Sequence, residues 1–104
     1  MRNIDHFIVG GPASPTGRTH KVWNPSTGEV QAEVPLGDAA LLDRAVARAK
    51  EVQPGWAATN PQKRARVFFK YKELIEANMQ ELAELLSSEH GKVVDDAKGD
   101  VQRG

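Results

Sequence analysis

The stretch VWNPSTGEV, residues 22–30, decides the fold of the first third of the chain. Pro25 fixes one backbone angle and Gly28 tolerates a positive one, so the middle of the stretch is a turn. β-Prone runs at residues 20–23 and 30–34 flank the turn, and the second run alternates in side-chain type at a period of two. The pattern predicts a β-hairpin with a connection of about five or six residues and one packed face.

Residues 1–37 as a whole have the composition of strands and turns, because they hold four of the six prolines and five of the nine glycines. A β-prone run at residues 7–9 is stopped by Gly-Gly-Pro at 10–12, and residues 13–18 are small and loop-like. The second hairpin strand is expected to close at residues 35–37. An amino-terminal short strand followed by the hairpin is the predicted order.

From residue 38 the apolar residues recur at steps of three and four, which is typical of amphipathic helices. Asp38 is a suitable N-cap for a first helix. Pro54 and Gly55 are expected to end that helix, with Trp56 folding back onto its apolar stripe. The stripe consists of Leu42, Ala45, Val46, Ala49 and Val52.

A second helix is expected at Asn60, whose side chain can cap free N–H groups, with Pro61 in the first turn. Its apolar stripe consists of Val67, Phe68, Tyr71, Leu74 and Ile75. Asn78 and Glu81 have the spacing of a capping box, which predicts a third helix that ends near Gly91. The second and third helices read equally well as one bent rod.

A last helix is indicated by Val93, Val94, Ala97 and Val101, interrupted by Gly99, and its apolar spacing still holds where the sequence reaches Gly104. Residues 38–104 are therefore predicted to form three to four amphipathic helices. With the strands of residues 1–37, the residues alone describe an α+β module.

Composition bounds the classes of function. A length of 104 residues corresponds to one domain or part of one. A formal net charge of zero argues against binding to nucleic acid. The sequence has no cysteine, and it has neither a signal-peptide-like segment nor an apolar run near the roughly 20 residues that span a bilayer. We therefore expect a cytoplasmic protein that does not bind a membrane.

Candidate reactive groups are few and scattered. His6, His20 and His90 lie far apart without a second ligand at metal spacing, so no metal site is predicted. Asp95 and Asp96 form one carboxylate pair and Glu81 with Glu84 another, but both pairs fall on solvated helix faces. The glycines at 10–11 and the Gly91-Lys92 pair lack the spacing of phosphate loops.

One segment of the second helix superficially resembles a surface that binds single-stranded nucleic acid. It combines Lys63, Arg64, Arg66, Lys70 and Lys72 with Phe68, Phe69 and Tyr71. The helical period explains the pattern better, because it places most of the aromatic residues on a buried stripe and the cations outside it. Salt-sensitive binding to single strands remains a third possibility at this stage.

A set of short phrases in a fixed order resembles the amino-terminal region of the aldehyde dehydrogenase superfamily. The phrases are FIVGG at residues 7–11, VWNPSTGEV at 22–30, VP at 34–35, DRAV at 43–46, Trp56, PQKRAR at 61–66 and EHGK at 89–92. Residues 96–104, DAKGDVQRG, are similar to methylmalonate-semialdehyde dehydrogenases, the coenzyme-A-acylating branch. Asp100 after Gly99 favours that branch, because Glu is frequent at this position elsewhere in the superfamily.

The resemblance implies an α/β fold in which residues 1–104 form the amino-terminal part of an NAD-binding domain, with the catalytic domain outside them. It implies NAD as cofactor, coenzyme A as acyl acceptor, the remainder of the dehydrogenase chain as partner, and a homo-oligomer, a tetramer in the family. A Cys thiolate attacks the aldehyde in this family, and no Cys occurs here. No catalytic, cofactor-binding or metal-binding residue is therefore assigned, and the 104 residues alone are predicted to be inactive.

The leading alternative is a stand-alone helical module for interaction or oligomerisation without catalysis. Under the dehydrogenase hypothesis, the apolar stripes need partners outside these residues, and exposed stripes cost about 25 cal/mol for each square ångström of lost burial. The isolated chain is then expected to be marginally stable or self-associating.

Overall fold

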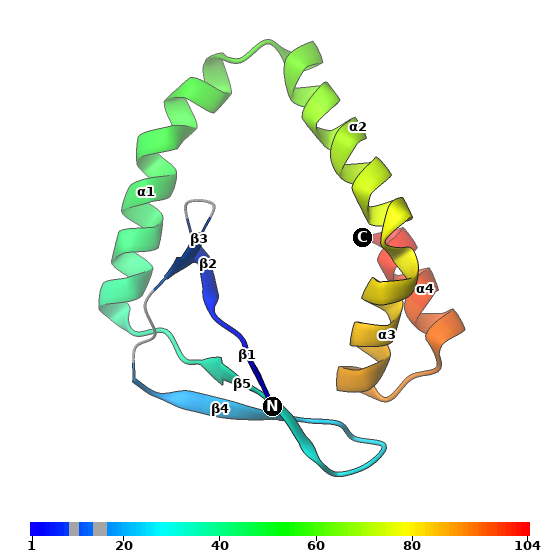
Figure 1. Ribbon diagram of the computed structural model, residues 1–104. Helices are drawn as coiled ribbons and strands as arrows, with labels where there is room; N and C mark the ends of the chain where they lie inside the picture. Colours follow the sequence, from blue (N-terminus) through cyan, green and yellow to red (C-terminus); the bar gives the residue numbers. More distant parts are fainter. Residues whose placement is uncertain (9–10, 14–16) are drawn as a thin grey trace. The chain divides into compact units, whose positions relative to one another are not determined.

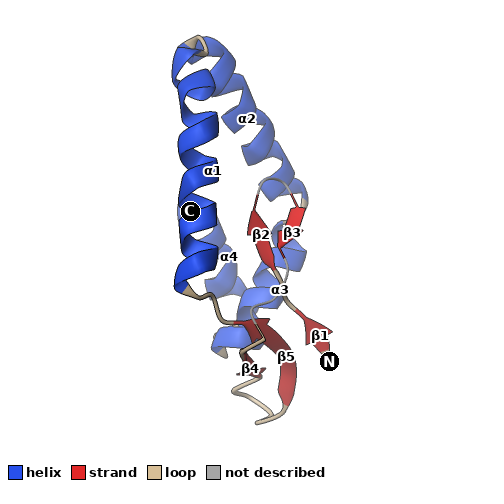
Figure 2. Ribbon diagram, turned by 90° about the vertical axis from the view of Figure 1, so that its left-hand side faces the viewer, coloured by secondary structure: helices blue, strands red, loops and turns tan. Residues whose placement is uncertain are grey.

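The computed structural model describes residues 1–8, 11–13 and 17–104, which form two compact units (Figures 1 and 2). The first unit combines Met1–Val22 with Val30–Thr59, and the second combines Trp23–Glu29 with Asn60–Gly104. Because the hairpin tip belongs to the second unit, the two units interleave along the sequence. Each is described by itself.

A three-stranded sheet carries the predicted hairpin. Its order is β1 (Arg2–Asn3), β5 (Val30–Pro35) and β4 (Thr19–Trp23). The prediction of the hairpin is confirmed, and β5 extends through Pro35 to a hydrogen bond of 2.8 Å from Leu36 N to Arg18 O. Strand β1 was not predicted, since two residues cannot display a period. It pairs in parallel with β5, with Arg2 opposite Ala32.

A second sheet pairs β2 (His6–Ile8) with β3 (Gly11–Ala13) in antiparallel register. The predicted strand at residues 7–9 starts one residue earlier, and Val9 and Gly10 lie outside the described residues. The expectation that Gly11 and Pro12 only stop a strand was wrong, since they belong to the returning strand. Proline is tolerated there because both strands of a two-stranded sheet are edges. Ala13 belongs to β3 and not to the expected loop.

Helix α1 (Ala39–Ala58) begins as predicted, because Asp38 Oδ1 accepts a hydrogen bond of 2.7 Å from Leu41 N. The predicted end at Pro54 was wrong. Proline removes one N–H donor, but its position is exposed, so solvent can hydrate the carbonyl that loses its partner. Trp56 therefore lies within the helix, four residues after Val52, and does not fold back from beyond its end.

Helix α2 (Pro61–Ala77) is capped by Asn60 Oδ1, which accepts from Gln62 N at 2.8 Å, as predicted. Helix α3 (Met79–His90) follows after the single residue Asn78. The predicted capping box was wrong, because the Asn78 side-chain amide donates to Leu74 O at 2.7 Å and so caps the end of α2. Gly91 ends α3 in the left-handed conformation, with φ of 88°, as expected.

Helix α4 (Val94–Arg103) runs through Gly99, so the predicted interruption was wrong. It packs against α3, and Ala83 of α3 and Ala97 of α4 both have 0% exposure. Small side chains at the contact let two helix backbones approach closely. The core of this pair is therefore made of alanine and not of large side chains.

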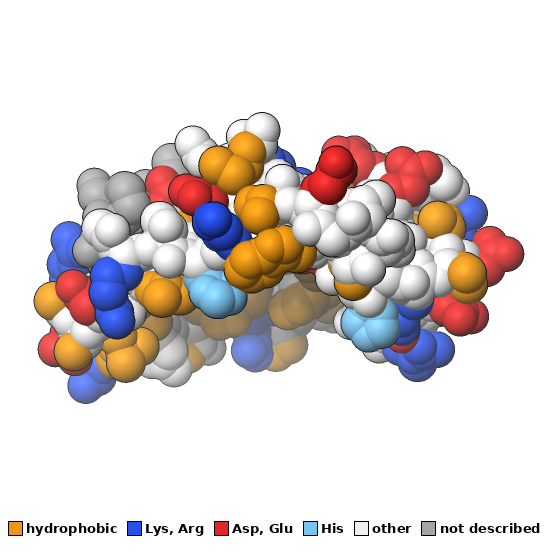
Figure 3. Space-filling model, turned by 90° about the horizontal axis from the view of Figure 1, so that it is seen from below, with side chains coloured by type: hydrophobic (Ala, Val, Ile, Leu, Met, Phe, Trp, Pro, Cys, Tyr) orange, Lys and Arg blue, Asp and Glu red, His pale blue; other side chains and the backbone are white. Residues whose placement is uncertain are grey.

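Large apolar side chains remain at the surface of both units, as one face of the molecule in Figure 3 illustrates. Among the described residues no large side chain is fully buried, and Leu42 and Phe68 are 64% and 63% exposed. The predicted stripes of α1 and α2 therefore exist as stripes, but the expectation that the aromatic residues of α2 are buried was wrong for this chain. Helical period fixes which side is apolar, whereas burial requires a partner.

Candidate functional surfaces

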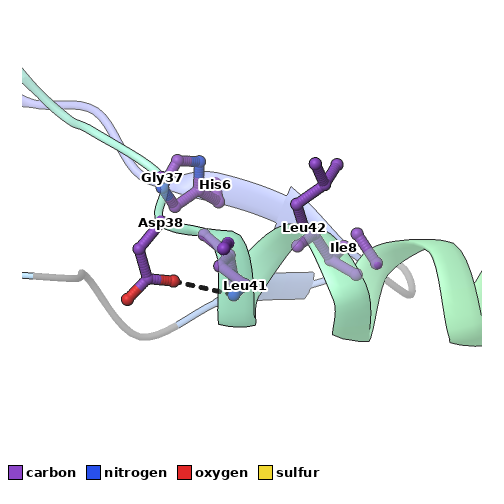
Figure 4. Close-up of a pocket in the computed structure, with 8 residues that line it drawn as sticks. His6, Ile8, Gly37, Asp38, Leu41 and Leu42 are labelled. Carbon is purple, nitrogen blue, oxygen red and sulfur yellow. Dashed lines mark hydrogen bonds between the residues drawn. The ribbon is translucent and has the colours of Figure 1, made fainter.

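The first open groove lies between β2 and the start of α1 and has a volume of about 490 Å³ (Figure 4). It is lined by His6, Ile8, Gly37, Asp38, Ala39, Leu41, Leu42 and Ala45. The Asp38 carboxylate caps the helix, so one of its oxygens is already engaged. His6 Nε2 is shielded from solvent and has no hydrogen-bond partner. Because most of the other lining side chains are aliphatic, the groove is mainly apolar. Such a groove suits an apolar side chain better than acid–base chemistry.

A second groove, about 620 Å³ in volume, lies within the helical unit. It is lined by Tyr71, Leu74, Ile75, Asn78, Glu81, Leu82, Leu85, Val101 and Gly104. Most of these side chains are apolar and come from three helices. The groove therefore continues the exposed stripe of α2 onto α3 and α4.

Several hydrogen bonds and ion pairs lie at the corner between α3 and α4. Ser87 Oγ donates to Lys92 O at 2.6 Å, and Gly91 N donates to Ser87 O at 2.8 Å. The Asp100 carboxylate pairs with both the Lys92 ammonium and the Arg103 guanidinium. These contacts join the residues of the loop to the last turns of α4.

The hydrogen bond from Lys92 is the main reason that the pKa of Asp100 lies below its ordinary value of 3.8. Partial burial opposes this effect, and Arg103 adds to it. A lowered pKa stabilises the folded corner above the ordinary pKa, and the contribution is lost as the pH falls through the lower folded value. The corner is therefore expected to loosen on acidification below pH 3.8.

Replacing Asp100 by Asn should make amide hydrogen exchange at residues 91–93 roughly two- to fivefold faster at neutral pH, the range typical of exposed ion pairs. It should also flatten the acid dependence of that exchange. Asp43→Asn, on exposed surface of α1, is the control and should leave these amides unchanged. Equal protection in wild type and Asp100→Asn at pH 7 would contradict the assigned role.

The histidines considered from the sequence are not brought together. His6 and His20 lie on β2 and β4 of the first unit, and His90 lies in the last turn of α3 in the second. Among residues 1–8, 11–13 and 17–104, no group of three or more His, Asp or Glu side chains is placed to hold a metal ion.

Three of the four paired acidic residues lie in the first turn of a helix. Asp95 and Asp96 are exposed in the first turn of α4, where carboxylates favour the positive end of the helix dipole. Glu81 has the same position in α3, and Glu84 accepts a hydrogen bond of 2.7 Å from Gln80. These contacts account for both pairs structurally.

The cations of α2 are partly paired on the helix itself. Lys70 contacts Glu73 at 3.2 Å and Lys72 contacts Glu76 at 3.3 Å. These pairs reduce the positive charge available to a polyanion. Gly91-Lys92 is a helix end, as expected, and Gly10 of the glycine pair lies outside the described residues.

Two features escaped the sequence analysis. One is the ion cluster of Lys92, Asp100 and Arg103, of which only the three-residue step from Asp100 to Arg103 was a visible signal. The other is Arg64, whose Nε is buried without a hydrogen-bond partner. Neither group forms a catalytic arrangement.

Comparison with known proteins gives the class. The model of the aldehyde dehydrogenase family matches residues 13–104, so the chain belongs to this family. The chain is 41% identical over its whole length to the malonate-semialdehyde dehydrogenase of Pseudomonas aeruginosa, of which it covers 21%. It is 47% identical to malonate-semialdehyde dehydrogenase 3 of Geobacillus kaustophilus, with 99% of the chain and 22% of that protein covered.

Solved structures point to the same group. A Sinorhizobium meliloti protein assigned as a methylmalonate-semialdehyde dehydrogenase, complexed with NAD, matches with a TM-score of 0.96 and 56% identity. The methylmalonate-semialdehyde dehydrogenase of Oceanimonas doudoroffii matches with a TM-score of 0.94 and 39% identity. Each match covers 99% of this chain and 21% of the other. The family and fold class implied by the resemblance are confirmed, and the chain spans about a fifth of the length of its relatives.

None of the helices in the described part of the chain combines the length and the apolar character that crossing a bilayer requires.

Proposed function

We propose that residues 1–104 form the amino-terminal part of the NAD-binding domain of a methylmalonate-semialdehyde dehydrogenase of the coenzyme-A-acylating type. The observation that carries the proposal is the match to the Sinorhizobium meliloti protein complexed with NAD, at 56% identity over 99% of this chain. Residues 1–37 contribute strands and residues 38–104 contribute helices. The enzyme would be cytoplasmic and a homo-oligomer, a tetramer as the family resemblance implies.

In the proposed enzyme, a Cys thiolate would attack the semialdehyde and be left carrying a thioester, for which NAD would supply the hydride acceptor. Coenzyme A would then take the acyl group, with loss of carbon dioxide when the substrate is methylmalonate semialdehyde. The 104 residues contain no Cys, so the proposal requires a thiolate outside them. The grooves at the start of α1 and within the helical unit are lined mainly by apolar side chains. The role proposed for this chain is therefore to build and brace the nucleotide-binding body, and not to touch the reacting atoms.

The ion-paired corner between α3 and α4 fits a bracing role. Lys92, Asp100 and Ser87 fix the loop between two helices, and Pro25 of the hairpin tip lies against Gly91. Because side chains of α3 and α4 and the hairpin tip all contact this loop, the loop can hold α4 in a fixed orientation.

A stand-alone helical interaction module is the second candidate, favoured by the exposed stripe of α2 alone. It predicts a stable and discrete oligomer of the 104-residue chain in solution. The dehydrogenase hypothesis predicts instead a chain that becomes stable only with the rest of the family fold.

A chimera tests the proposal. Residues 1–104 replace the matched first fifth of the Sinorhizobium meliloti protein, and NAD reduction is followed with methylmalonate semialdehyde and coenzyme A. The expected activity is within about tenfold of the parent, the cost of small shifts in geometry. A folded chimera without activity, beside an active parent, would contradict the proposal.

A further inference from the structure

We infer that one face of α2 is the surface on which the rest of the dehydrogenase packs, with Arg64 as its polar anchor. This surface, called the α2 face below, consists of Val67, Phe68, Tyr71, Leu74 and Ile75. The inference rests on the proposed function and adds to it the element, the side of that element and the hydrogen bond by which this chain holds its partner.

The α2 face is both apolar and uncovered. Its residues follow each other at helical steps of one, three and four, so they share one side of the helix. Phe68 is 63% exposed, Tyr71 59% and Val67 55%. The groove that begins at Tyr71 continues this surface onto Leu82 and Leu85 of α3. A contiguous apolar surface of this kind marks an interaction site in a soluble chain.

Phe69 supplies an internal comparison. It is 70% exposed and has the same side chain as Phe68. It stands two residues from both Val67 and Tyr71, which is about 200° around the helix and so on the opposite side. If exposure alone defined the docking surface, substituting either phenylalanine would have the same effect on stability. If the α2 face is the docking surface, only the substitution of Phe68 should lower stability.

Arg64 places a polar group at one end of the α2 face. It precedes Phe68 by four residues and Tyr71 by seven, which places it on the α2 face near the start of the helix. Its Nε is buried and has no hydrogen-bond partner. A donor that is shielded from water without an acceptor is costly, so we expect the Arg64 side chain to turn toward a carbonyl or carboxylate oxygen of the occupant.

The occupant is the remaining part of the dehydrogenase and not a second copy or a nucleic acid. About four fifths of the Sinorhizobium meliloti chain lies outside the match, while the matched fifth has a TM-score of 0.96 to this chain. A nucleic acid would need free cations, but Lys70 and Lys72 are paired with Glu73 and Glu76. In a symmetric antiparallel pairing of two copies, Arg64 near the start of α2 would lie opposite Leu74 and Ile75 near its end, which offer no side-chain acceptor.

The test compares Phe68→Ser with Phe69→Ser in the chimera described above. Phe68→Ser should lower the melting temperature and reduce the folded-to-unfolded ratio by about a hundredfold or more, as for removal of a buried aromatic ring. Phe69→Ser should remain close to the parent. Equal effects of the two substitutions would overturn the inference, whether or not the chimera is active.

Arg64→Met is the second variant, because it keeps the side chain as far as the ε position and removes the Nε donor and the guanidinium group. It should lower the melting temperature of the chimera and leave the helical circular dichroism of the 104-residue chain unchanged, since the acceptor is present only in the chimera. If the substitution also reduces the helical circular dichroism of the 104-residue chain, Arg64 acts within the helix. That result would overturn its role as an anchor.

These outcomes separate the two claims. Enzyme activity of the unmodified chimera reports on the proposed function, and the difference between Phe68 and Phe69 reports on the α2 face. If Phe68→Ser instead dissolves an oligomer of the 104-residue chain and leaves the chimera unaffected, the occupant is a second copy and the inference is wrong.

Discussion

The 104-residue chain in isolation is expected to unfold without a sharp thermal transition or to self-associate, whereas the same residues in the chimera should melt cooperatively. The reason is the small size of its core. Among the described residues the buried apolar ones are Ala32, Leu41, Ala83 and Ala97, and of these four only Leu41 has a large side chain. A set dominated by alanine removes little apolar area from water.

The missing burial is large on the scale of domain stability. Burying a Val, Leu or Phe side chain contributes about 1.5 to 3 kcal/mol, and the large side chains of α2 are roughly half exposed. Covering the α2 face would thus contribute on the order of 5 kcal/mol. The net stability of a whole domain is only about 5 to 15 kcal/mol, so this one surface decides whether the fold is stable.

Circular dichroism and scanning calorimetry measure the transition, and analytical ultracentrifugation measures the mass in dilute solution. The expected result is a broad transition, binding of a dye that detects exposed apolar surface, and a mass that rises with concentration. A monomer with a cooperative transition at high temperature would contradict the expectation, and it would favour the stand-alone module.

Replacing Gly91 by Ala is expected to destabilise the chimera by roughly 2 to 3 kcal/mol. Gly91 has a φ of 88°, which a residue with a Cβ adopts only at a cost. A Cβ at this position would also lie 2.9 Å from Pro25 Cγ, in the tip of the hairpin. Since the proline ring is rigid, the hairpin tip itself would have to move.

Gly28→Ala is the matched control, because Gly28 has a similar φ of 76° but nothing within 4 Å of the added Cβ. It should cost only the backbone penalty, about 1 kcal/mol. Chemical denaturation of the two variants, with the unmodified chimera beside them, measures the difference. If both substitutions cost the same, the contact between the hairpin tip and Gly91 does not contribute to stability.

Local signals in the sequence predicted local structure well. The Asn-Pro-Ser-Thr-Gly turn, the Asp38 and Asn60 caps and the left-handed Gly91 all depend on residues within one turn of each other. Predictions from local patterns were wrong where another group competed for the same side chain. Asn78 has capping-box spacing toward α3, yet its side chain bonds back to α2.

Non-local features could not be read from the sequence. Strand β1 exists only because its residues meet β5, and the Lys92 to Asp100 pair joins residues eight positions apart. The prediction that the aromatic residues of α2 are buried was wrong for the same reason. The sequence shows the helical period of the stripe, but it does not show which surface covers the stripe. The family resemblance succeeded because it depends on the order of many short phrases, each of them a local pattern.

The parallel pairing of β1 with β5 has a consequence for synthesis on the ribosome. Arg2 and Asn3 are made before their partners Ala32 and Glu33, which emerge roughly thirty residues later, and closing such a loop costs conformational entropy. The hairpin that sets β5 beside β4 closes a much shorter loop. Strand β1 is therefore expected to be the last strand to join its sheet.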